Sequence, residues 1–368
     1  MELIKAHRDA ILKPLQTVAG IVEKRHTLPI LSNVLLTKNG ESVSFLATDV
    51  EIQIQTSATL STTPDNAKVT VSAKKLLDVL RSLSDTTEVS IQLNGKKASI
   101  QAGKSRFALQ TLGAEDFPTV SVNSAFVASF AIAQKKLKHL FQMVHFAMAQ
   151  QDIRYYLNGL LLVTDGKFVR VVATDGHRLA FCEAEVEGDL AKQEVILPRK
   201  SVLELLKLLG DTDEPVNIDV AANQAKFRFN DVEMISKLVE GKFPDYQRVI
   251  PQGYNKHIIL NKDTFAATLA RVSIMTSDKF KGVRLALGES LLKIQSSNAE
   301  QEEAADELDI DYVGDLIEIG FNVSYLQDVL NNLKVDQIQL SFGDANTSAL
   351  LTLPNDESFK YVVMPMRI

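Results

Sequence analysis

The stretch Val171-Val172-Ala173-Thr174-Asp175 is a short apolar run that ends in a small polar corner. A similar stretch, Phe45-Leu46-Ala47-Thr48-Asp49, stands 126 residues earlier, and Ile294-Gln295-Ser296-Ser297-Asn298 stands 123 residues later. Self-similarity at a nearly fixed spacing is the signature of tandem structural repeats. These stretches therefore predict one module repeated three times.

Two further kinds of segment recur in the same order. A strand followed by a helix with a one-faced apolar stripe recurs at 71–83, 197–209 and 321–333. A closing hairpin recurs at 89–101, 216–229 and 338–353. The first hairpin contains Asn94-Gly95 between two alternating runs, which is a strong signal for a tight turn.

The spacing of these landmarks sets the predicted organisation of the chain. We predict module 1 at 1–125, module 2 at 126–253 and module 3 at 254–368. Each module has several strands but only two helices, the first of them near 8–24, 134–149 or 262–275. That proportion favours an α+β fold, with two helices on an antiparallel sheet, over a parallel α/β fold with strict strand–helix alternation.

Charge is segregated along the chain. The formal net charge is −6, yet the six predicted helical segments hold 16 basic and 6 acidic residues, so the helices carry +10 and the remainder −16. If the helices share one surface, that surface would admit a polyanion; the simpler interpretation is that each helix has a solvated charged face. There is no zinc-finger spacing, no RNP motif and no Trp, so any nucleic-acid contact should be with the backbone and independent of sequence.

The stretch 173–178 is the most enzyme-like part of the sequence, because Asp175 and His177 could form the acid–base pair of a hydrolase. The sequence has no GxSxG elbow, no phosphate-binding glycine loop and no HExxH. The matching Asp49 is not followed by a histidine. We therefore interpret the recurring Asp as a turn cap, and predict a non-catalytic protein without a metal or cofactor.

The single cysteine, Cys182, excludes an intrachain disulfide framework and has the apolar neighbours of a buried structural thiol. The first ten residues lack the apolar core of a signal peptide. No apolar run approaches the length of a membrane span. The expected location is the cytoplasm.

The repeat does not explain two segments, one acidic and one apolar. The acidic run 300–307 lacks the glycine and ligand spacing of a calcium loop. It is either a solvated loop or a complement to a basic edge such as Lys104-Ser105-Arg106. The tail 361–368 is apolar and rich in adaptable methionine, which predicts a last core strand whose final residues form a pocket wall.

Taken together, the segments resemble the bacterial sliding clamp, the β subunit of DNA polymerase III. The matching residues span all three modules, at 28–31, 151–159, 173–179, 236–239, 243–246, 320–325 and 362–367. The resemblance implies a head-to-tail homodimer of six modules that encircles duplex DNA. It also implies a hydrophobic pocket for short peptides of the replicative polymerase subunit, the clamp loader and other replication and repair proteins.

The resemblance assigns roles to individual residues. The peptide pocket maps to Leu157, Thr174, Gly176, His177, Arg178, Leu179, Pro244, Arg248, Val249, Ser348, Val362, Val363, Met364, Pro365 and Met366. DNA contacts map to Arg25, Arg81, Gln151, Tyr155, Tyr156 and Lys200. The dimer contact maps to Phe107 and Leu109 on one side and Ile274 and Met275 on the other, with the charged edges Lys104, Arg106, Glu300, Glu302 and Glu303 beside them. A hydrolase, or a repeat scaffold that binds proteins only, remains the alternative.

Overall fold

A computed structural model describes residues 1–22, 28–61, 63–121, 125–277 and 281–367. The chain divides into two compact units. Unit 1 consists of Met1–Lys135 and Lys207–Leu238, and unit 2 consists of Lys136–Leu206 and Val239–Ile368. The division between the units thus runs through the second predicted module.

Unit 1 is built on one sheet of twelve strands, ordered β1-β6-β7-β8-β5-β2-β3-β4-β14-β13-β12-β9. These strands are β1 (Glu2–His7), β2 (Asn33–Asn39), β3 (Ser42–Thr48), β4 (Ile52–Thr59), β5 (Ala67–Ser72), β6 (Glu88–Asn94), β7 (Lys97–Ala102), β8 (Ser105–Leu112), β9 (Phe126–Ala133), β12 (Pro215–Ala221), β13 (Gln224–Phe229) and β14 (Val232–Lys237). Antiparallel pairing of β4 with β14, in which Ile54 faces Met234, joins strands of predicted modules 1 and 2 into one sheet.

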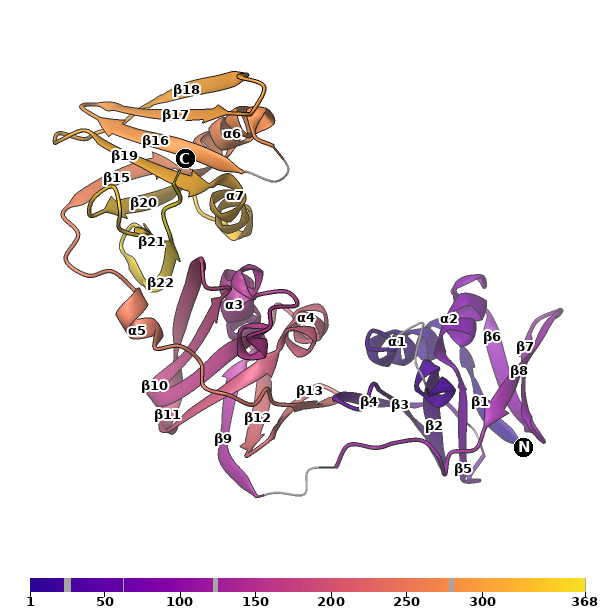
Figure 1. Ribbon diagram of the computed structural model, residues 1–368. Coiled ribbons are helices and arrows are strands. Elements are labelled where there is room, and N and C mark those ends of the chain that lie inside the picture. The colour runs from indigo at the N-terminus through magenta and orange to yellow at the C-terminus, as the bar shows by residue number, and fades with distance from the viewer. Residues whose placement is uncertain (23–27, 62, 122–124, 278–280, 368) are drawn as a thin grey trace. The chain divides into compact units, whose positions relative to one another are not determined.

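Two helices cover this sheet within predicted module 1. They are α1 (Arg8–Ala19) and α2 (Ala73–Arg81), which lie side by side in Figure 1, and a short 3-10 turn, η1 (Pro29–Ser32), precedes β2. Leu76 and Leu80 are buried on one face of α2, as the apolar stripe predicts. The Ser72 hydroxyl accepts a hydrogen bond from the N–H of Lys75 (3.4 Å) and so caps the start of α2.

Unit 2 contains two antiparallel sheets. The six-stranded sheet has the order β10-β11-β22-β21-β20-β15, and the four-stranded sheet the order β18-β17-β16-β19. Their strands are β10 (Gly159–Thr174), β11 (Arg178–Pro198), β15 (Lys256–Asn261), β16 (Gly282–Gly288), β17 (Leu291–Ser297), β18 (Glu303–Asp309), β19 (Ile317–Asn322), β20 (Gln337–Phe342), β21 (Ala349–Leu353) and β22 (Asp356–Val363). The pairing of β11 with β22, in which Leu179 faces Val362, joins predicted modules 2 and 3.

The remaining helices and helical turns follow the strands of modules 2 and 3. They are α3 (Gln134–Val144), η2 (His145–Ala147), η3 (Tyr155–Leu157), α4 (Arg199–Leu208), α5 (Tyr246–Val249), α6 (Lys262–Val272), η4 (Ser273–Met275) and α7 (Val323–Asn332). Asn261 and Asn322 cap α6 and α7 by accepting backbone N–H groups. The six predicted amphipathic helices are confirmed as α1, α2, α3, α4, α6 and α7, each shorter than its predicted segment. Within the described residues no helix has both the length and the apolarity that a membrane span requires.

Candidate functional site

The corner between β10 and β11 is held by its own side chains. The Thr174 hydroxyl donates to the carbonyl of Arg178 (2.6 Å) and accepts from the N–H of Gly176 (3.1 Å). The Asp175 Oδ1 atom accepts from the N–H groups of His177 (2.9 Å) and Arg178 (3.1 Å). This confirms the interpretation of Asp175 as a turn cap.

Because Gly176 has no side chain, the backbone of the corner can lie close to the guanidinium group of Arg154. Its φ of 91° lies in the left-handed region that favours glycine. A Cβ atom at this position would stand 3.0 Å from the guanidinium nitrogens of Arg154. Arg154 itself is held by Asp152 (2.9 Å) and by the carbonyl of Asp175 (3.3 Å). The hydrogen bonds from Arg154 lower the pKa of Asp152 to about 2, so this pair stays charged at neutral pH.

Arg178 ties the corner to distant parts of unit 2. Its guanidinium contacts Asp175 (3.1 Å) and Asp328 of α7 (2.6 Å), and donates to the carbonyl of Phe146 (2.8 Å). The ring of Tyr325 lies 4.5 Å from the guanidinium carbon. Because the Arg178 side chain is only 9% exposed and all its nitrogens are engaged, it fixes the corner in place and is not itself free to bind a ligand.

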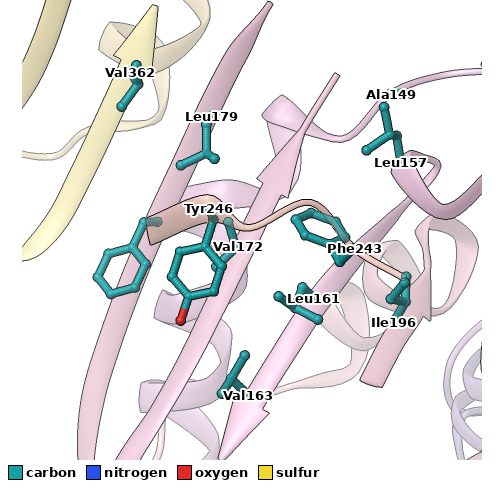
Figure 2. Packing of buried hydrophobic residues seen from close by; sticks show 11 residues of the cluster. Ala149, Leu157, Leu161, Val163, Val172, Leu179, Ile196, Phe243, Tyr246 and Val362 are labelled. Atoms are coloured by element: carbon teal, nitrogen blue, oxygen red, sulfur yellow. The ribbon is translucent and has the colours of Figure 1, made fainter. Parts of the chain in front are cut away.

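An apolar cavity of about 110 Å³ lies beside this corner; we call it the anchor pocket. Its lining consists of Arg154, Tyr156, Leu157, Thr174, Gly176, His177, Arg178, Leu179, Pro244, Val249, Val362 and Met364. Figure 2 shows Leu157, Leu179 and Val362 in one buried cluster with Phe243 and Tyr246, residues of a segment that crosses the sheet. The N–H of Met364 donates to the carbonyl of His177 (2.9 Å). This hydrogen bond holds the residue that follows β22 at the rim of the pocket.

The structure brings together ten of the fifteen residues predicted for the pocket: Leu157, Thr174, Gly176, His177, Arg178, Leu179, Pro244, Val249, Val362 and Met364. The other five, Arg248, Ser348, Val363, Pro365 and Met366, do not belong to the lining of this cavity. Val363 is buried next to Val362 on β22, where successive side chains point to opposite faces.

Two lining residues were missed or assigned elsewhere by sequence reasoning. Arg154 was not singled out, although it lies in the quoted segment 151–159, and Tyr156 was assigned to DNA contact. The signal that could have found Arg154 is Gly176, because a glycine in a corner often marks a close approach of another group.

The side chains that a hydrolase could use at this corner already form other contacts or are buried. Both oxygens of Asp175 are taken by backbone N–H groups and by Arg178, and the ring of His177 stacks on Tyr325 with centroids 6.4 Å apart. Cys182 is buried, and burial raises the pKa of its thiol to about 12. This arrangement supports packing and turn formation and offers no acid–base pair at the corner.

The residues predicted to contact DNA lie on several elements. Arg81 ends α2 in unit 1. In unit 2, Tyr155 and Tyr156 form η3, Lys200 lies in the first turn of α4, and Gln151 has a positive φ of 56°. Arg25 lies outside the described residues.

The residues predicted for the dimer contact lie at sheet edges or beside them. In unit 1, β8 carries Phe107 and Leu109, and its segment 105–110 pairs with β7 but with no other described strand. Phe107 is half-buried and Leu109 is buried. In unit 2, β18 is the edge strand of the four-stranded sheet and begins at Glu303. Ile274 of η4, which lies against β18, is 72% exposed.

Comparison with known proteins covers almost the whole chain. Residues 1–121, 131–245 and 247–367 match the N-terminal, central and C-terminal domain models of the DNA polymerase III beta subunit. The chain is 44% identical over 362 residues to the beta sliding clamp of Pseudomonas aeruginosa and 42% identical over 361 residues to that of Escherichia coli, with 98% of both chains covered in each case.

A solved structure agrees with these matches. The crystal structure of the sliding clamp from Pseudomonas aeruginosa bound to griselimycin is 43% identical, covers 100% of both chains and superposes with a TM-score of 0.96. The fold is therefore the α+β clamp fold with three tandem copies of one module. The chain belongs to the DNA polymerase III β subunit family, the bacterial sliding clamps, whose members are processivity subunits of the replicative polymerase and not catalytic enzymes.

Proposed function

We propose that the anchor pocket captures short linear peptides of replication and repair proteins, and that two copies of this chain close head to tail into a ring on duplex DNA. The observation that carries the first part is the anchor pocket itself. It is mainly apolar, it lies beside a rigid corner, and the flexible thioether of Met364, 45% exposed, forms part of its rim. Such a wall can reshape around different apolar side chains.

The peptide that fits is extended, with Gln near its start and Leu and Phe near its end. Leu157, Leu179 and Val362 offer the buried apolar wall for its anchor residues. The partners would be the replicative polymerase subunit, the clamp loader and other replication and repair proteins, all acting in the cytoplasm. Arg248, Ser348, Pro365 and Met366 would form the more open part of the groove outside the cavity, whereas Val363 is buried on the other face of β22 and would support Val362 from behind.

Calorimetry with such a peptide tests the proposal. Deletion of residues 364–368 removes the Met364 wall and should abolish measurable binding. Sedimentation of the same truncated chain should still report a dimer, because the proposed dimer edges lie elsewhere. Undiminished peptide affinity would move the binding site away from the tail, and loss of the dimer would make the tail a structural element.

The proposed dimer joins the edge of β8 on one copy to the edge of β18 on the other. Both edges leave backbone hydrogen-bonding groups available, which strands satisfy by pairing with a second chain. The charges are complementary: Lys104 directly precedes β8 and Arg106 lies on it, while Glu300 and Glu302 precede β18, which begins at Glu303. Phe107, Leu109, Ile274 and Met275 would supply the apolar centre.

Replacement of both Ile274 and Met275 by Ala should shift the dimer toward monomer in sedimentation. A dimer mass that stays unchanged at micromolar concentration would remove these residues from the interface.

DNA would be held by topology and by weak contacts with the phosphate backbone. The candidate residues are Arg25, Arg81, Gln151, Tyr155, Tyr156 and Lys200. Backbone contacts of this kind are sensitive to salt and independent of sequence. A ring loaded on a nicked circle should remain until the circle is cut and should then run off the ends. Equal retention on linear and circular DNA would contradict the topological link.

A further inference from the structure

The segment 152–158, which we call the pocket loop, supplies three residues of the anchor pocket lining. These are Arg154, Tyr156 and Leu157. Within the loop only Tyr155–Leu157 has regular structure, the short turn η3. A binding wall made by a loop contributes fully to affinity only if the loop is already ordered, because ordering it during binding costs conformational entropy. The contacts that order the pocket loop therefore bear on peptide binding.

The side chain of Asn158 closes the pocket loop onto its first residue. Its Oδ1 atom accepts a hydrogen bond from the N–H of Asp152 (2.9 Å), and its Nδ2 atom donates to the carbonyl of the same residue (2.9 Å). A carboxamide can make this pair because it carries both an acceptor and a donor, whereas a carboxylate is an acceptor only. One side chain thus engages both backbone groups of Asp152.

Asp152, fixed in this way, holds a residue of the pocket lining. Its carboxylate accepts hydrogen bonds from the backbone N–H of Arg154 (2.8 Å) and from the guanidinium of Arg154 (2.9 Å). That guanidinium in turn lies against Gly176 in the corner. The contacts therefore run from Asn158 through Asp152 to Arg154.

The Asn158 end of the pocket loop is tied to other elements of unit 2. The carbonyl of Asn158 accepts the N–H of Arg199 (3.1 Å), the first residue of α4. The carbonyl of Leu157 accepts the N–H of Ala149 (3.0 Å), and both residues belong to the buried cluster of Figure 2. Asn158 therefore joins the fixed end of the loop to its other end.

We propose that Asn158 is a positioning residue for peptide binding, which holds the pocket loop in its binding geometry before a peptide arrives. This inference rests on the proposed peptide capture. The described residues that line the anchor pocket include neither Asn158 nor Asp152, so Asn158 acts through Arg154, Tyr156 and Leu157. Its contribution is to reduce the ordering cost that the peptide would otherwise have to offset.

Titration calorimetry of the full chain with a Gln–Leu–Phe peptide tests the proposal on Asn158→Asp. This substitution keeps the size and the acceptor but replaces the donor by a second acceptor that faces the carbonyl of Asp152. We expect the peptide affinity to fall about three- to thirtyfold. Asn158→Ala removes both hydrogen bonds without adding a charge. It is the second variant and should lose affinity in the same range.

The matched control is Asn261→Ala in the same unit. The Oδ1 atom of Asn261 accepts the N–H of Thr264 (2.9 Å) and caps α6, so this variant also loses a hydrogen bond between an Asn side chain and the backbone. It should have a lower free energy of unfolding but an unchanged peptide affinity. The control thereby separates positioning of the pocket loop from a general loss of stability.

Limited digestion with trypsin reports the order of the pocket loop itself. Cleavage after Arg154 requires the loop to open, and its rate follows the population of the open form. A loss of affinity of the expected size means that the loop is ordered in only a minority of the variant molecules. Both Asn158 variants should therefore be cleaved after Arg154 at least about tenfold faster than the unaltered chain, and saturating peptide should slow the cleavage.

Three results would overturn the proposal. The first is unaltered peptide affinity in both Asn158 variants, and the second is reduced affinity without faster cleavage after Arg154. The third is an equal loss of affinity in Asn261→Ala. Failure of the unaltered chain to bind the peptide at all would instead contradict the proposed peptide capture, so the two failures are distinguishable.

Discussion

The corner of module 1 and the corner of module 2 are built alike, but only the second borders the anchor pocket. In module 1 the Thr48 hydroxyl donates to the carbonyl of Ile52 (2.8 Å), as Thr174 does to Arg178. The Asp49 Oδ1 atom accepts from the N–H groups of Glu51 (3.0 Å) and Ile52 (2.7 Å), as Asp175 does from its own corner.

The residues that follow the shared Thr-Asp pair account for the difference. Val50 stands where module 2 has Gly176, with a φ of 78° that is strained for a β-branched residue. Gln53 stands where module 2 has Leu179, and its side-chain oxygen accepts the N–H of Val120 (2.8 Å). The corner therefore stabilises the turn in both modules, and we expect peptide binding to depend on the side chains placed around it.

The largest expected effect comes from placing a bulky side chain at Gly176, in the corner of module 2. Gly176→Val adds a side chain at φ 91° and pushes its Cβ against Arg154, 3.0 Å away. We expect peptide affinity to fall at least about tenfold, and the free energy of unfolding to fall by about 1–3 kcal/mol. Calorimetry and chemical denaturation measure the two effects. Full peptide affinity in this variant would mean that Gly176 does not shape the pocket.

The next largest effect distinguishes the two roles of Asp175, which caps the turn and forms an ion pair with Arg178. Asp175→Asn keeps an acceptor for the backbone but loses the charge that faces Arg178, whose side chain is 9% exposed. We expect it to lower the free energy of unfolding by about 2 kcal/mol. Denaturant unfolding measures the loss, and an unchanged free energy of unfolding in the Asp175→Asn variant would show that the ion pair with Arg178 adds nothing to the second corner.

A smaller effect tests whether module 1 can be converted. Gln53→Leu introduces the residue type of Leu179 but removes the acceptor for the N–H of Val120, at a cost of about 1 kcal/mol. We expect calorimetry still to find one peptide per chain, because Val50 and Glu51 remain in place of Gly176 and His177. A stoichiometry of two would make position 53 the single determinant of a pocket.

The sequence predicted the three modules, the six helices and the capping role of Asp175, because these depend on short-range patterns. It could not predict that Arg178 reaches Asp328, 150 residues further along the chain, or that Arg154 lies against Gly176. Such contacts arise only when distant strands pair, as β11 does with β22. All fifteen pocket residues were assigned through resemblance to the family, which already combines sequence with tertiary structure, and only the tail 361–368 was also predicted from its own composition as a pocket wall.

The smallest effect concerns strain in the first corner. Val50→Gly relieves the positive φ, while the greater freedom of glycine in the unfolded chain opposes the gain. We expect the free energy of unfolding to rise by about 0.5 kcal/mol, with peptide affinity unchanged. Thermal or denaturant unfolding beside calorimetry measures both, and a destabilised variant would indicate that the Val50 side chain makes contacts that outweigh its strain.

A crystal structure of the full chain with a Gln–Leu–Phe peptide tests the central claim most directly. We predict one peptide per chain, with its apolar anchor against Leu157, Leu179 and Val362 and with Met364 moved to cover it. Peptide density beside Val50 and Gln53, or only at a surface away from both corners, would contradict the account.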